Sequence, residues 1–219
     1  VRLVLADSTG HEAADYLLPP TASWHPTTEW RAGQVWRGQH FLRLPAHLKG
    51  GGYRWKLELL PGGWRAELAQ VLRVEEPERL FEPWSVGIES GVSLGGLATL
   101  VGGDVEVSSG EVVVRLEWRA EGTGEESYHV FVHLVDGEGR LVRQSDGAPG
   151  GWRRPTTGWV AGEYVLDEHR LDVAGLPAGE YSVVVGLYEP GGARLRASDG
   201  RDAIVLTTLS LHQEHGQSP

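Results

Sequence analysis

Four tryptophans stand beside a loop sequence that occurs twice in the chain, as PTTEWRAG at residues 26–33 and as PTTGWVAG at residues 155–162. An exposed indole ring can stack on the apolar face of a sugar, and neighbouring threonine hydroxyls can hydrogen-bond to its hydroxyl groups. The sequence therefore predicts four candidate carbohydrate contacts, which are Trp24, Trp30, Trp152 and Trp159. The alternative is structural: Pro-Thr-Thr shapes a turn, Trp30 and Trp159 fill the end of the fold, and the other two tryptophans cover its rim.

The histidines and acidic residues do not form the patterns that catalysis or metal binding requires. His129 and His133 are four residues apart in a strand-like segment, which separates their side chains by roughly 13 Å, too far to share one ion. The turn at residues 136–139 lacks the spacing of a calcium loop. The cluster at residues 167–169 is expected at a strand edge, with His169 as a hydrogen-bonded structural residue. We therefore predict no catalytic residue, no metal site, no cofactor and no enzymatic activity.

The repeated loop belongs to a longer internal repeat. Its two copies are 129 positions apart (155 − 26 = 129), and at the same offset Asp7 matches Asp136. One residue is dropped before Tyr53, which then matches Tyr181. Regular matches over about 65 positions indicate a duplicated domain.

Apolar and polar residues alternate along most of the chain, which is typical of half-buried antiparallel strands. In VVVRLEW one face carries Val112, Val114, Leu116 and Trp118, and Arg115 and Glu117 lie on the other. The segments YHVFVHLVD and YSVVVGLYE are apolar on both faces and predict central strands, and DGEG between VFVHLV and RLVRQ predicts a hairpin. We predict an all-β protein of two tandem immunoglobulin- or fibronectin-like antiparallel β-sandwiches.

The two copies are unequal in length. We assign residues 1–78 to the first sandwich, residues 79–211 to the second, and residues 212–219 to a polar tail. Ahead of the repeated part, the second copy carries two predicted strands, at about 94–101 and 111–119, and the first copy lacks their equivalents. A sandwich without them would expose backbone donors and part of its core, so we expect upstream sequence or another chain to supply the missing strands.

Composition excludes several classes of partner. The formal net charge is −10, and no basic stripe is present, which argues against nucleic acid. No stretch approaches the roughly 20 apolar residues of a membrane helix, so we expect no membrane contact by this part of the protein. The chain has no Cys and no Met, which fits a heat-adapted source or simply a GC-rich genome.

Residues 128–196 combine the motifs VFVHLVD, LPAGEY and VGLYEP, and residues 1–65 share this pattern more loosely. The combination resembles a β-sandwich module at the C-terminal end of bacterial polytopic membrane glycosyltransferase-like proteins of the dolichyl-phosphate-mannose type. The resemblance implies an extracytoplasmic, non-catalytic accessory region of a membrane-attached protein. The alternative that it implies is a carbohydrate-binding module that presents a glycan or lipid-linked sugar to the attached enzyme. A transferase's catalytic carboxylates would lie in its membrane portion, so no catalytic residue is assigned here.

Overall fold

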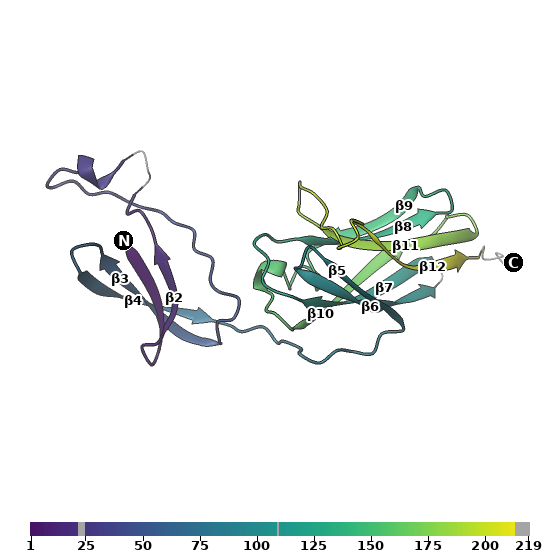
Figure 1. The fold of residues 1–219 in the computed structure, drawn as a ribbon, viewed down its shortest axis with the longest axis horizontal. Helices are drawn as coiled ribbons and strands as arrows, with labels where there is room; N and C mark the ends of the chain where they lie inside the picture. Colours follow the sequence, from purple (N-terminus) through teal and green to yellow (C-terminus); the bar gives the residue numbers. More distant parts are fainter. Residues whose placement is uncertain (22–24, 109, 213–219) are drawn as a thin grey trace, which may run out of the picture. The chain divides into compact units, whose positions relative to one another are not determined.

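The computed structural model describes residues 1–21, 25–108 and 110–212 (Figure 1). Its regular elements are the antiparallel strands β1 to β12 and two short 3-10 helices, η1 (Thr27–Glu29) and η2 (Thr156–Gly158). The predicted all-β class is confirmed. The chain divides into two compact units, Val1–Glu78 and Arg79–Pro219.

The second unit contains two four-stranded sheets that share one hydrophobic core. One sheet has the strand order β10-β7-β6-β5, and the other has the order β12-β11-β8-β9. Figure 1 shows them as two layers. The strands are β5 (Ile88–Leu94), β6 (Ala98–Ser108), β7 (Glu111–Ala120), β8 (His129–Asp136), β9 (Leu141–Gly147), β10 (Tyr164–Asp172), β11 (Gly179–Tyr188) and β12 (Ile204–Leu211).

The core of the second unit follows the predicted alternation. One face of β7 is buried, through Val112, Val114, Leu116 and Trp118. The facing sheet contributes alternate residues of β8 and β11, namely Val130, Val132, Leu134, Tyr181, Val183, Val185 and Leu187. Both strands are central in their sheet, as their apolar character on both faces predicts. The hairpin predicted at DGEG joins β8 to β9 and is also confirmed.

The segment ahead of β8 holds three strands rather than the two predicted. The predicted strand at 94–101 is wrong because it spans a hairpin turn. Gly95 and Gly96 have φ angles of 58° and 65°, and two consecutive left-handed residues form the tight turn that matches the twist of a hairpin. The chain therefore reverses between β5 and β6, where the apolar run LGGLATLV suggested one continuous strand.

The first unit contains one sheet among residues 1–21 and 25–78, with the order β2-β1-β3-β4. Its strands are β1 (Arg2–Asp7), β2 (Glu12–Leu17), β3 (Gly51–Leu59) and β4 (Trp64–Val74). The order reproduces β9-β8-β11-β12 of the second unit, strand for strand. The registers also agree, because Asp7 pairs with Tyr53 just as Asp136 pairs with Tyr181. The duplication seen in the sequence is thus a duplication of one sheet.

The counterpart of β10 does not form a strand in the first unit. Residues 35–43 match β10 at the offset of 129 (164 − 129 = 35), yet they join no ladder among the described residues. In the second unit β10 pairs with β7 along its whole length, from Tyr164 to Asp172. The described part of the first unit has no equivalent of β7, so this segment has no strand to pair with.

Candidate functional site

The two repeated loops begin with the same backbone turn but place their tryptophans differently. In each loop the backbone N–H of the tryptophan donates to the carbonyl of the first threonine, at 3.2 Å for both Trp30 and Trp159. Trp159 is 0% exposed, and its Nε1 donates to the Arg154 carbonyl at 2.8 Å. A ring packed in this way is part of the core, so Trp159 has no free face for a sugar, and the structural alternative describes it.

Trp30 is 38% exposed at the matched position. The two tryptophans differ in exposure because the connection between β7 and β8, at residues 121–128, covers the loop of Trp159. There the Thr123 hydroxyl donates to the Trp159 carbonyl at 2.7 Å, and the Tyr128 N–H donates to the Thr156 hydroxyl at 2.9 Å. The described part of the first unit has no such connection to cover its loop. The predicted contact Trp24 lies outside the described residues.

Trp152 is the one predicted contact of the second unit that the structure presents at the surface. It is 65% exposed, and its φ of 69° is left-handed, which is rare for a bulky residue. Its ring meets the edge of His129 at a centroid distance of 4.9 Å, and His129 in turn meets Tyr188 at 5.6 Å. These three residues and the neighbouring Asp146 form what we call the Trp152 surface.

Two titratable groups that interact with Asp146 are perturbed by their surroundings. Burial lowers the pKa of the His133 imidazole, which the Asp146 carboxylate at 3.5 Å partly offsets. Burial raises the pKa of the Tyr188 phenol, and Asp146 adds to that effect. Asp146 therefore lies close to the His133 imidazole and the Tyr188 phenol as a hydrogen-bond acceptor, an arrangement that suits a polyhydroxylated ligand.

A cleft that the sequence analysis did not identify lies on the outer face of the sheet β10-β7-β6-β5. Its volume is about 470 Å³, and its lining includes Trp84, Asp104, Arg115, Glu117, Gly150 and Arg153. Trp84 is exposed, whereas Glu117 is fully buried. The Glu117 Oε1 accepts a hydrogen bond from the backbone N–H of Trp84 at 2.6 Å. The Glu117 Oε2 has no hydrogen-bond partner among the described residues.

A buried carboxylate oxygen without a partner costs free energy, and native structures commonly satisfy such an atom with water or a ligand. The sequence signal for this cleft was weak. Glu117 alternates with the core residues of β7 and was expected to face solvent beside Arg115. It is buried because the chain passes over that face at residues 84–87, where the Gly87 N–H donates to Asp104 at 2.9 Å.

The structure also brings together a serine, a histidine and an aspartate. The Ser145 hydroxyl lies 3.0 Å from His169 Nδ1, and Asp167 lies 2.9 Å from His169 Nε2. The order of ring nitrogens is the reverse of the protease triad, in which the acid contacts Nδ1. Because Ser145 is on β9 and the other two are on β10, the array joins neighbouring edges of the two sheets. The predicted hydrogen-bonded role of His169 is confirmed, and its partner Ser145 was not foreseen.

The acidic turns use their carboxylates to hold the backbone. Asp136 accepts the N–H groups of Glu138 and Arg140 at 3.0 and 2.9 Å, and Asp7 accepts those of Thr9 and His11 at 2.8 and 3.0 Å. The hydrogen bond from the backbone N–H of Arg140 is the main reason that the pKa of Asp136 lies below its usual range. Across the part of the chain that the structure describes, no group of three metal-ligating side chains comes together.

No helix within the described ranges has the length and apolar character needed to cross a bilayer. Comparison with known proteins found no protein-family model and no curated protein that matches this chain.

Proposed function

We propose that this chain is a non-catalytic accessory region of a larger extracytoplasmic protein of the cell envelope, with β-sandwich modules as its building blocks. The observation that carries this proposal is that the residues shared by both copies serve to hold the fold. The recurrent aspartates close hairpins, and the recurrent Tyr53 and Tyr181 donate to carbonyls four residues earlier, both at 2.9 Å. A duplicated framework of this kind spaces and supports other parts of a protein.

The envelope location and the association with a glycosyltransferase follow from the resemblance of residues 128–196 alone. The location is tested by adding protease to intact spheroplasts that express the natural full-length protein. We expect this region to be cleaved from outside, while a cytoplasmic marker stays intact. Cleavage only after lysis would contradict the proposed location.

Carbohydrate binding is the second candidate function, and the cleft at Trp84 and Glu117 favours it. A cleft of about 470 Å³ falls within the usual range for small-ligand sites. The exposed Trp84 can stack on a sugar ring, and the Glu117 Oε2 can accept a sugar hydroxyl or a bridging water. The Trp152 surface and Trp30 supply further exposed indoles.

We expect Trp84→Ala to weaken saccharide binding by about tenfold or more, because the stacking contact of one indole contributes on the order of 1 kcal/mol beyond its buried area. Binding is measured on a glycan array and then by calorimetry with the glycan selected. Trp152→Ala is the matched control, since it removes an exposed indole that does not line the cleft. Loss of binding in Trp152→Ala alone would move the site to the Trp152 surface, and binding unaffected by either variant would contradict both positions.

A further inference from the structure

We propose that the first unit is an acceptor for a three-stranded antiparallel sheet equivalent to β5–β7, supplied by polypeptide that precedes β1 in the same protein. On docking, residues 35–42 become the edge strand of a second sheet, as β10 is in the second unit. The inference is independent of whether the second unit binds a sugar.

The first observation is an apolar sheet face that is incompletely covered. Leu59 is 42% exposed, whereas the matched Leu187 is 0% exposed. Leu3 and Leu57 are only half-buried, although the residues matched to them, Val132 and Val185, are fully buried. In the second unit this face is covered by the sheet β10-β7-β6-β5. The apolar residues of the first unit have kept the pattern that such a cover requires.

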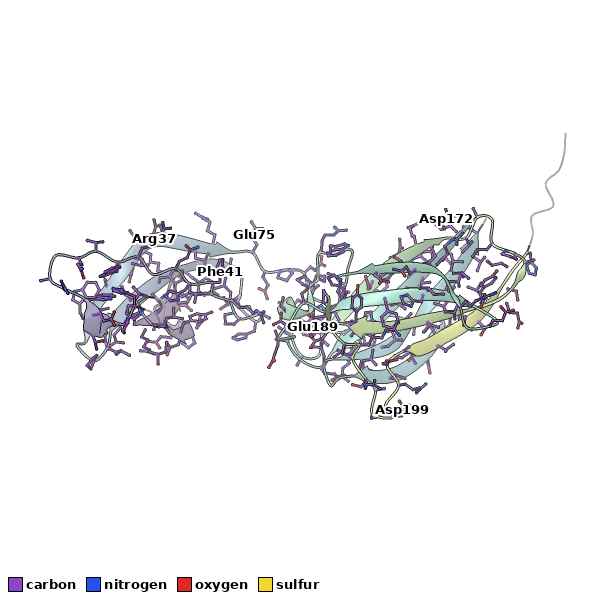
Figure 2. The ribbon with its side chains drawn as sticks, turned by 90° about the horizontal axis from the view of Figure 1, so that it is seen from above. Arg37, Phe41, Glu75, Asp172, Glu189 and Asp199 are labelled. Atoms are coloured by element: carbon purple, nitrogen blue, oxygen red, sulfur yellow. The ribbon has the colours of Figure 1, made fainter. Side chains whose placement is uncertain are left out.

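The second observation is a segment that matches β10 in the repeat but lacks a ladder. At the offset of 129, Trp36 and Leu42 occupy the positions of the inward Val165 and Leu171. Arg37 and Phe41, labelled in Figure 2, stand at the outward positions of the same pattern. The ladder to β7 holds β10 as a strand, so the matched segment can form a strand once an equivalent of β7 pairs with it.

The third observation is the open loop at η1. Thr27 is exposed, whereas the matched Thr156 is fully buried beneath the connection at residues 121–128. That connection follows β7 directly and leads into β8.

A single contiguous element fills all three gaps in the second unit, namely the segment of residues 88–128. It covers the sheet face, pairs with β10 through β7, and closes the loop at η2. Two copies of the first unit packed face to face would cover the apolar face but would leave the loop open. Because both units share one strand order, the equivalent element belongs ahead of β1, where a similar connection reaches it without crossing the sheet.

The test compares hydrogen exchange of residues 35–42 in the 219-residue chain and in the natural polypeptide that includes about 45 further residues upstream, a typical length for three strands with turns. We expect these amides to exchange rapidly in the shorter chain and to gain protection on the order of 100-fold or more in the longer one, because ladder amides exchange through opening of the structure. Continued rapid exchange in the longer polypeptide, or a gene that encodes no residues ahead of Val1, would overturn the proposal.

Two neighbouring variants of the longer polypeptide serve as matched tests. Leu42→Asp places a charge beneath the incoming sheet and should abolish the protection, whereas Phe41→Asp stays on the outer face and should retain it. Equal protection of residues 35–42 in the two variants would contradict the predicted strand orientation. A 219-residue chain that dimerises and protects residues 35–42 by itself would assign the acceptor face to a second copy instead.

Discussion

Replacing Trp159 by Ala should lower the unfolding free energy of the second unit by about 3–5 kcal/mol, the usual cost of removing a fully buried large aromatic side chain. The ring is 0% exposed, and its Nε1 donates to the Arg154 carbonyl, which would lose this partner. Part of the cost comes from the cavity, because a closely packed core relaxes only in part around an empty volume. The measurement is calorimetry of the full chain, following the transition of the second unit.

The duplication provides the control for this variant. Trp30→Ala changes the matched position, where the ring is partly exposed, and should leave the transition of the second unit unchanged. Trp152→Ala removes an exposed ring from the second unit itself and should cost under about 1 kcal/mol. If Trp159→Ala cost no more than Trp152→Ala, the buried position of Trp159 would be wrong.

Replacing Glu163 by Ala should cost about 3–5 kcal/mol as well, because it removes a buried charge that faces two arginines. Glu163 is fully buried, and its Oε2 accepts from Arg79 at 2.5 Å and from Arg154 at 2.9 Å. Its Oε1 also accepts the Val160 N–H at 3.0 Å. The side chain therefore ties the first residue of the second unit to the loop that holds Trp159. Urea-induced unfolding of the full chain measures the loss.

Two further variants separate charge from hydrogen bonding at this position. The first unit has Gln34 at the matched site. The Gln34 Oε1 accepts the backbone N–H of Arg31 at 2.9 Å, just as the Glu163 Oε1 accepts the backbone N–H of Val160. Glu163→Gln should keep that loop bond and so lose less than Glu163→Ala. Glu168→Ala breaks pairs with Arg115 and Arg170 at an exposed site and should cost under about 1 kcal/mol. Equal losses in Glu163→Ala and Glu168→Ala would show that burial adds nothing to the Glu163 pairs.

Local patterns predicted those features that depend on neighbours along one strand. Alternation placed Trp118 in the core, and apolar character on both faces placed β8 and β11 at the centre of a sheet. Glu117 follows the same alternation, yet it is buried, because residues 84–87 cover it from outside. Nothing in the residues near a strand reports which distant segment will cross over it, so the cleft at Glu117 could not be predicted.

The tryptophans show the same limit. PTTEW and PTTGW are nearly identical, and both form the same turn, but one indole is exposed and the other is buried. Their burial depends on residues 121–128, which have no counterpart in the described part of the first unit. Likewise, residues 35–42 match β10 in the repeat and still form no strand, because pairing requires a second strand beside the segment.

The strand order also bears on how each unit reaches its fold. The central ladders join β1 to β3 and β8 to β11, pairs that are separated by long stretches of chain, and such non-local pairing slows folding because loop closure precedes most of the stabilising contacts. In the second unit β5, β6 and β7 are successive hairpins with low contact order, so they can form early and offer a surface on which β8 and β11 collapse. The described part of the first unit has the local hairpins β1–β2 and β3–β4 but no three-stranded counterpart of β5–β7. The two copies of the sheet therefore share one strand order, and we expect the second unit, which carries the non-duplicated hairpins β5–β7, to form its sheet faster than the first unit does.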